Sequence, residues 1–329
     1  MKKITIKDLA LETQLSTSTI SRVLNGSSLI PETTKRKVDS AAKKLNYKPR
    51  VISRQKNRAI LNIVIFLPDY LENSLNFIFN YPSLIAHIKN QKLNNPFNLI
   101  TELKHNFNSF MKLHKKKNID GVIFTIPPDS IEQYQTLAKN NIPCITFNKV
   151  LTDNNYVRSD DLAGFNLMLE KVSHKRKPIQ PCFINIKPNQ FLDSERSQAF
   201  MSACKNFNFP IDNELIFSID KIADINYKLI NEIRRKKINT VFCYNDYIAS
   251  AVIQTARLHR LSIPEEILIC GFGSSVYRDV IQPKPATIFI PTKEYGSCIA
   301  NWIESKIIKR EKKLFQKSIA GEYLSSETF

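Results

Sequence analysis

The sequence predicts an α/β protein in which a three-helix headpiece precedes a larger core with doubly wound parallel sheets. Three observations predict this class. Up to residue 47, short segments carry apolar residues at helical spacing. From residue 59 onward, short apolar, often β-branched runs alternate with amphipathic stretches, as in a parallel sheet covered by helices. A length of 329 residues leaves room for about two domains.

The headpiece segment predicts two short helices joined by a tight turn and then a third helix, which is the plan of a helix-turn-helix. Ser16 is placed as the N-cap of the second helix, and Asn25-Gly26 ends that helix. The third helix covers about residues 32–45, and Pro49 marks its limit. The residues expected to face inward repeat at helical spacing: Ile6, Leu9, Ala10, Ile20, Val23, Leu24, Val38, Ala41, Ala42 and Leu45.

The second helix, residues 17–24, is expected to enter a DNA major groove. Thr17 and Ser18 point outward in its first turn and can touch base edges, and the guanidinium of Arg22 matches guanine O6 and N7. A solvated helix face is the alternative for any one of these residues alone. Further polar residues are placed for phosphate contacts, which fix register without reading sequence: Ser21, Asn25, Thr34 and Tyr47.

The charge distribution favours a polyanionic partner. The formal net charge is +18, and residues 1–58 hold 14 basic and 4 acidic residues, more than half of the excess in less than a fifth of the chain. Within the basic hinge or linker of residues 50–58, Arg50, Arg54 and Lys56 are further candidates for DNA contact. For the hinge, the alternative is a disordered basic linker that touches nothing, and for the total charge it is a Lys/Asn/Ile-rich compositional bias.

Other features narrow the class of protein. The six cysteines are far apart and show no metal-ligand spacing, so we expect reduced thiols in a cytoplasmic protein. The sequence shows no signal peptide and no run of 18 apolar residues, so no membrane span is expected. The five histidines lack metal-ligand spacing, and no nucleophile elbow, Walker A or GxGxxG motif occurs. We therefore expect no enzyme activity, catalytic residue, metal or cofactor.

Three motifs occur within some forty-five residues: Ile-Thr-Ile-Lys-Asp-Leu-Ala at 4–10, Ser-Thr-Ser-Thr-Ile-Ser-Arg-Val-Leu-Asn at 16–25 and Leu-Asn-Tyr-Lys-Pro at 45–49. The spacing between them matches a known family without insertion or deletion. Together they closely resemble the DNA-binding headpiece of the LacI/GalR family of bacterial repressors. The resemblance implies that Thr17, Ser18 and Arg22 occupy the family's base-reading positions.

Two positions depart from that family. Its members usually have Ala-Gly between the first two helices, where this chain has Thr13-Gln14, and a non-glycine residue at positive φ costs on the order of 1 kcal/mol. The family's hinge helix carries a leucine that wedges into the minor groove and kinks the operator, and this position falls on Lys56. Because lysine cannot act as an apolar wedge, we expect little operator bending, with the central base pairs held by charge from Arg50, Arg54, Lys56 and Arg58.

The core is expected to contain parallel strands separated by helices. Strands are predicted at residues 60–67, 97–103, 121–126, 144–148, 182–186, 215–219, 240–244 and 268–272. Helices are predicted at residues 131–140, 162–172, 194–206, 225–236 and 247–258. On such sheets, ligands bind beyond the carboxyl ends of the strands.

Three core motifs are Asp120-Gly-Val-Ile-Phe, Asn245-Asp246 after a strand, and Ser-Ile-Pro-Glu-Glu-Ile-Leu-Ile-Cys-Gly-Phe at 262–272. They resemble the family's periplasmic-binding-protein type I-like sensor, which implies two α/β lobes with a cleft between them. The implied boundaries are a headpiece at 1–49, a hinge at 50–58 and a core at 59–329, with lobe 1 at about 59–158 and 290–317 and lobe 2 at about 159–289 and 318–329.

The resemblance also implies an effector, a sugar or sugar derivative, in the cleft. Arg196, Asn245 and Asn148 match family positions, but Gly273 replaces an Asp that accepts hydrogen bonds from sugar hydroxyls. The alternatives are an interlobe salt bridge for Arg196 and a strand-end turn for Asn245. Residues that could compensate for Gly273 are Asp69, Asp160, Asp161 and Tyr277. The expected effector site comprises Asp69, Asn148, Arg196, Asn245, Asp246 and Ser274.

These features predict a sequence-specific repressor of a carbohydrate-utilisation operon, controlled by the effector. A homodimer on a pseudo-palindromic operator is expected, because one headpiece reads too few base pairs for operator-level affinity. The alternative is a DNA-binding repressor with a degenerate cleft, either not switched by a sugar or controlled by a partner protein. Gly273 and the altered hinge favour that alternative.

Overall fold

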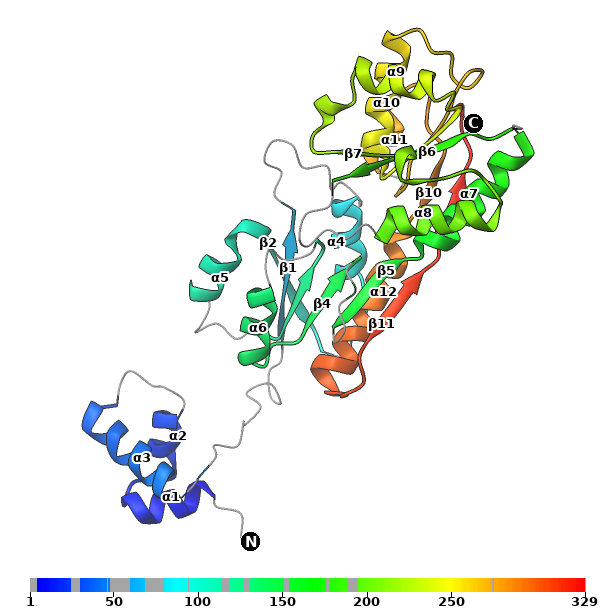
Figure 1. Cartoon of the computed structure of the whole chain (residues 1–329). Helices are drawn as coiled ribbons and strands as arrows, with labels where there is room; N and C mark the ends of the chain where they lie inside the picture. Colours follow the sequence, from blue (N-terminus) through cyan, green and yellow to red (C-terminus); the bar gives the residue numbers. More distant parts are fainter. Residues whose placement is uncertain are drawn as a thin grey trace. The chain divides into compact units, whose positions relative to one another are not determined.

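The computed structural model of the chain divides into two compact units, Met1–Arg58 and Ala59–Phe329 (Figure 1). Each unit has an apolar core of its own. The structure describes residues 5–24, 30–45, 47, 60–68, 80–93, 95–113, 119–126, 131–148, 150, 154–175, 178–187, 195–273 and 275–328.

The first unit packs its helices around a small apolar cluster. Its described residues form α1 (Ile6–Thr13), α2 (Thr17–Leu24) and α3 (Glu32–Lys44). All three helices contribute to the buried cluster, which confirms the inward faces predicted from helical spacing. The cluster consists of Leu9, Ile20, Val23, Val38 and Ala41, with Ile6, Ala10, Leu24, Ala42 and Leu45 packed at its margin.

Local hydrogen bonds set the ends of these helices. The backbone N and the hydroxyl of Thr5 both donate to Asp8 Oδ2, at 2.6 and 2.7 Å, at the start of α1. Ser16 Oγ accepts from the backbone N of Thr19 at 3.0 Å, which confirms Ser16 as the N-cap of α2. Gln14 ends α1 in the left-handed region, with φ 54°. The expected non-glycine turn between α1 and α2 is therefore present.

A substitution at Gln14 measures the cost of this turn. Gln14→Gly removes the Cβ that disfavours the left-handed conformation, so we expect it to stabilise the first unit by about 0.5–1 kcal/mol. Gln14→Ala keeps the Cβ and is the matched control, with no gain expected. Amide hydrogen exchange of residues 6–24 in the full-length chain, measured across a urea series, compares the two. Equal protection in both variants would show that the turn is unstrained.

Two parallel sheets form the framework of the second unit (Figure 1). The larger sheet contains β1 (Leu61–Leu67), β2 (Phe97–Leu103), β3 (Gly121–Phe124), β4 (Cys144–Phe147), β5 (Asn155–Ser159) and β11 (Gln316–Ile319). The smaller sheet contains β6 (Pro181–Ile186), β7 (Ile216–Ile219), β8 (Thr240–Cys243) and β9 (Leu268–Cys270). Their strand orders are β11-β5-β4-β3-β1-β2 and β7-β6-β8-β9, with parallel pairing throughout.

A short antiparallel pair and the helices complete this unit. The pair joins β10 (Thr287–Phe289) to β12 (Glu322–Leu324), and the bridge between Gly273 and Phe289 sets β10 beside the chain that follows β9. Beside the larger sheet lie α4 (Tyr81–Lys89), α5 (Phe107–Leu113), α6 (Ile131–Lys139) and α12 (Thr292–Trp302), which continues into a π-helical turn at Ile303–Ile308. Beside the smaller sheet lie α7 (Asp161–Lys175), α8 (Glu195–Asn206), α9 (Tyr227–Arg235), α10 (Asp246–Leu258) and α11 (Val276–Val280).

All eight predicted strands and five predicted helices are present, with ends that differ by at most three residues. The prediction missed β5, β10, β11 and β12, and it missed α4, α5, α11 and α12. In β11 only Ile319 is buried, because this strand lies at the edge of its sheet. A strand with so little buried surface carries no apolar run in its sequence.

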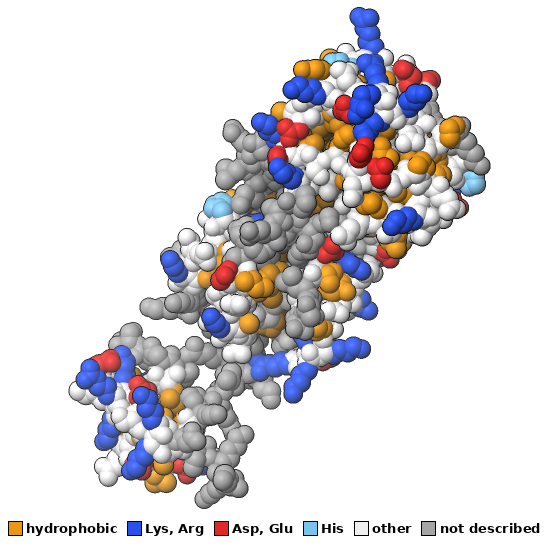
Figure 2. Space-filling view, in the orientation of Figure 1, with side chains coloured by type: hydrophobic (Ala, Val, Ile, Leu, Met, Phe, Trp, Pro, Cys, Tyr) orange, Lys and Arg blue, Asp and Glu red, His pale blue; other side chains and the backbone are white. Residues whose placement is uncertain are grey.

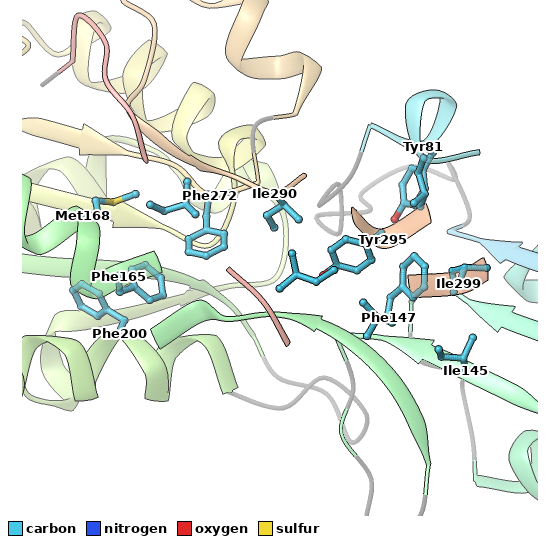
Figure 3. Close-up of a cluster of buried hydrophobic side chains, with 14 of the residues drawn as sticks. Tyr81, Ile145, Phe147, Phe165, Met168, Phe200, Phe272, Ile290, Tyr295 and Ile299 are labelled. Carbon is cyan, nitrogen blue, oxygen red and sulfur yellow. The ribbon is translucent and has the colours of Figure 1, made fainter. Parts of the chain in front are cut away.

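One apolar cluster extends from the larger sheet to the smaller one (Figure 3). On the side of the larger sheet, the rings of Phe147 and Tyr295 lie 5.0 Å apart. On the side of the smaller sheet, the rings of Phe165 and Phe272 lie 5.1 Å apart. Ile290 lies between these two groups in the same cluster. The two sheets therefore share a continuous apolar layer, whose burial is the main favourable contribution to the folding of this unit.

Candidate functional site

The outer face of α2 is polar and accessible. Thr17, Ser18 and Arg22 are exposed, whereas Ile20 and Val23 are buried in the apolar cluster. At about 100° per residue, the three exposed side chains fall within an arc of about 140°. The Ser18 hydroxyl lies 2.7 Å from Ser16 Oγ, so the N-cap also orients this side chain. The arrangement offers two hydroxyls and a guanidinium to one partner surface.

The residues predicted to contact phosphates are less exposed. Ser21, Thr34 and Tyr47 are half-buried, and Tyr47 packs against the apolar cluster while its backbone N donates to Ala42 O at 2.8 Å. The ring of Tyr47 therefore anchors the end of α3. The remaining predicted DNA contacts, Asn25, Arg50, Arg54 and Lys56, lie outside the described residues.

In the second unit, the guanidinium of Arg196 is buried, with 3% of the residue exposed, and each of its three nitrogens donates a hydrogen bond. Its Nε donates to Asp161 Oδ2 at 2.8 Å, its Nη1 to Tyr244 O at 2.7 Å, and its Nη2 to Asp161 Oδ1 at 3.3 Å and Ser159 Oγ at 3.4 Å. The group also lies 4.6 and 4.4 Å from the ring centroids of Tyr244 and Phe272. Burial alone would lower the pKa of Arg196, but the charge and hydrogen bonds of Asp161 raise it overall.

Asn148 belongs to the same network through Ser159. Asn148 Oδ1 accepts from the backbone N of Ser159 at 2.9 Å and from the hydroxyl of Tyr295 at 3.1 Å. Ser159 Oγ in turn donates to Asp161 and accepts from Arg196. The Nδ2 of Asn148 is buried and has no hydrogen-bond partner among the described residues. The structure thus joins Asn148 and Arg196, two predicted effector residues, in one network in which the Nδ2 donor of Asn148 has no acceptor among the described residues.

Asn245 and Asp246 are fully buried at the carboxyl end of β8. Asn245 Oδ1 accepts from the backbone N of Ile248 at 2.9 Å and caps α10, which agrees with the strand-end alternative. Asp246 accepts from the backbone N of Ser275 and from the hydroxyl of Thr287, both at 2.6 Å. Through these two hydrogen bonds Asp246 links the segment after β9 to β10. The side chains of Asn245 and Asp246 therefore stabilise the backbone around the site.

Several partners in this network carried no clear signal in the sequence. Asp161, considered only as compensation for Gly273, is the counter-ion of Arg196. Ser159 at the end of β5, Tyr244 after β8 and Tyr295 within α12 were not predicted, because their partners come from distant parts of the chain. Asp69 and Ser274 lie outside the described residues.

In the part of the chain that is described, no group of three or more His, Cys, Asp and Glu side chains is arranged to hold a metal. No helix within that part has the length and hydropathy of a membrane span.

Asp246 gives the second unit a pH dependence. Burial raises the pKa of Asp246 from 3.8 to about 6. Between these values the folded chain binds a proton that the unfolded chain has released, so the stability that this group contributes falls as pH rises from about 4 to 6 and levels off above the higher pKa. Asp246→Asn removes the titration. In urea unfolding at pH 4.5 to 7.5, we expect the stability of the wild type minus that of Asp246→Asn to fall with rising pH. A difference that grows with pH would contradict the raised pKa.

Known proteins match this chain in both units. Residues 5–50 match the family described as bacterial regulatory proteins, lacI family, and residues 174–320 match the periplasmic binding protein-like domain. The HTH-type transcriptional regulator RegA of Clostridium acetobutylicum is 28% identical over 308 residues, with 89% of each chain covered. The HTH-type transcriptional regulator DegA of Bacillus subtilis (strain 168) is 26% identical over 309 residues, covering 90% of this chain and 89% of DegA.

Solved structures share the fold over nearly the whole chain. A complex of the transcriptional regulator CelR with cellobiose has a TM-score of 0.69 at 18% identity, with 99% of this chain and 100% of CelR covered. The lac repressor dimer bound to operator has a TM-score of 0.65 at 17% identity, with 99% of each chain covered. The fold of this chain, a helical unit followed by a core with two parallel sheets, is therefore also found in these two regulators.

Proposed function

Since the chain belongs to the LacI family of DNA-binding transcriptional regulators, we propose that it represses a carbohydrate-utilisation operon and responds to a sugar or sugar derivative. The observation that carries the proposal is the outer face of α2. Its opposite face is buried against α1 and α3, so a compact three-helix unit presents Thr17, Ser18 and Arg22 to solvent. Side chains presented in this way can reach base edges in a major groove.

The proposed division of labour on DNA follows the exposure of the side chains. Thr17, Ser18 and Arg22 read bases, and the less exposed residues of the headpiece touch phosphates. The proposed phosphate contacts are Ser21, Asn25, Thr34 and Tyr47. The hinge residues Arg50, Arg54 and Lys56 hold the centre of the operator by charge and bend it little.

An alanine substitution at Arg22 tests base reading. Loss of a bidentate contact to guanine removes about 1–3 kcal/mol of discrimination. Arg22→Ala should therefore reduce the preference for a duplex selected by the wild type over random duplex by about 5- to 150-fold. The matched control is Arg36→Ala, which removes another exposed arginine from the same unit. Fluorescence anisotropy with both duplexes measures the ratio, and an undiminished preference in Arg22→Ala would refute the proposed reading surface.

We further propose that the protein acts as a homodimer on a pseudo-palindromic operator. One headpiece covers too few base pairs for operator-level affinity. The lac repressor, with the same fold, is a dimer in its operator complex. In this chain, Val276 and Val280 are 53% and 80% exposed one turn apart on α11, and Leu258 is 80% exposed at the end of α10. Exposed apolar side chains of this kind support an interface with a second copy.

For the effector, the proposed site surrounds the network of Asn148 and Arg196, with Asp69, Asn245, Asp246 and Ser274 as its other predicted members. The unused amide of Asn148 supports a ligand with hydrogen-bond acceptors. The cellobiose complex of CelR and a ribose complex of a LacI-family regulator from Enterococcus faecium support the sugar class. The second candidate is a regulator with a degenerate site. The engagement of Arg196 by Asp161 and the burial of Asp246 favour it.

A thermal-shift screen of sugars and phosphosugars separates these two candidates. A ligand at one hundred times its Kd stabilises the folded chain by about 2.7 kcal/mol, so a true effector should raise the Tm of the wild type. Asn148→Ala should reduce that shift, because the amide that the ligand engages is lost. Gln316→Ala, which changes an exposed side chain of the same sheet, should keep it. Absence of any shift across a broad panel would support the degenerate site.

A further inference from the structure

The connection between α12 and β11 is strongly basic. Between residues 303 and 317 the chain has six basic and two acidic residues. Four consecutive cations of this segment are exposed, with a single acidic residue among them: Lys309, Arg310, Lys312 and Lys313. Figure 2 shows Lys and Arg side chains gathered at the end of the core where this connection lies in Figure 1.

Hydrogen bonds to the backbone hold this segment in place. Lys306 Nζ donates to the carbonyl oxygens of Glu311 and Lys313. The backbone N of Glu311 donates to Ser305 O at 2.9 Å, and that of Phe315 donates to Asn155 Oδ1 at 2.9 Å. With its backbone fixed to the π-helical turn and to β5, the segment presents its charged side chains to solvent at a low cost in conformational entropy.

The basic segment lies at a defined edge of the larger sheet. All strands of this sheet are parallel, so the connections into β2, β4 and β11 meet at its amino-terminal edge. The other two connections and the helix ends before them add exposed Lys89, Lys92 and Lys139. The chain also enters the core at this edge, because Ile60 directly precedes β1. Ile60, the first described residue of the second unit, therefore lies at the same edge of the sheet as these cations.

We propose that this basic edge binds the phosphates of the DNA duplex next to the site that the headpiece reads. The inference rests on the proposed function. The connection between α12 and β11 also contains two described acidic residues: Glu304, whose Oε1 lies 3.5 Å from Lys309 Nζ, and the exposed Glu311. The excess of positive charge matches a duplex, which carries one negative charge per about 1.7 Å of its axis. The contact adds affinity without adding sequence preference.

The salt dependence of DNA binding tests this surface. In full-length Lys312→Gln/Lys313→Gln, the side chains change but the carbonyl groups that accept from Lys306 remain. If both lysines contact phosphates, the slope of log K against log salt for a random-sequence 60-bp duplex should become about 1.8 less steep. Between 50 and 200 mM salt, the affinity of the wild type should then fall about tenfold further than that of the variant.

Two control variants make the outcome specific. Lys205→Gln/Lys228→Gln removes the same charge from exposed positions on α8 and α9 and should leave the slope unchanged. Lys312→Arg/Lys313→Arg keeps the charge and should also keep the wild-type slope. An unchanged slope in Lys312→Gln/Lys313→Gln, or an equal change in the Lys205→Gln/Lys228→Gln control, would overturn the proposal. The outcome is distinct from failure of the reading surface, because Arg22→Ala alters the ratio between duplexes and this variant alters binding to both.

Discussion

The pairing of the buried Arg196 guanidinium is the constraint on which the centre of the core depends. A cation removed from water is tolerated only when a counter-ion and hydrogen-bond acceptors replace its hydration. Asp161 supplies the counter-ion from the first turn of α7, and the carbonyl of Tyr244 supplies an acceptor from the end of β8. The rings of Tyr244 and Phe272 also lie close to the group, 4.6 and 4.4 Å from its central carbon. One side chain of α8 thus fixes three other segments of the smaller sheet's lobe.

This constraint reaches the larger sheet through Ser159 at the end of β5. Its hydroxyl contacts Arg196 and its backbone N donates to Asn148, which follows β4. The polar network contacts the apolar layer through Tyr295 and Phe272, both members of the cluster in Figure 3, and an unpaired charge beside such a layer is costly. A ligand that binds Arg196 must therefore compete with Asp161. Only the difference in free energy between the ligand–Arg196 and the Asp161–Arg196 interaction can therefore shift the arrangement of the lobes.

The sequence predicted those parts that depend on local pattern. The helices of the first unit carry N-cap and apolar signals within a few residues of each other, and the buried strands of the core are continuous apolar runs. The turn at Gln14 was also predictable, because members of the family that the headpiece resembles usually have a glycine where this chain has Gln14, and Gln14 does adopt a positive φ. The strand β11 escaped prediction because three of its four residues are exposed.

The contacts of the candidate site were less predictable for a different reason. Arg196 and Asp161 are 35 residues apart, and Asn148 and Tyr295 are 147 residues apart, so no local pattern joins them. Residue type alone could not show that Asp246 serves the framework, since the same carboxylate would suit a ligand. Its enclosure between Ser275 and Thr287 is a property of the folded chain.

The two surfaces proposed for DNA differ in what they contribute to binding. The polar face of α2 is small, and its hydroxyls and guanidinium distinguish base edges. The basic edge of the core has charge but no fixed donor pattern, so it contributes affinity that is independent of sequence and weakened by salt. The edge belongs to the same sheet as β4 and β5, whose opposite ends carry Asn148 and Ser159. The proposed effector site and the proposed phosphate-binding edge therefore lie at opposite ends of the same strands, so the two proposals together would couple ligand binding to DNA affinity through one sheet without altering the residues that read its sequence.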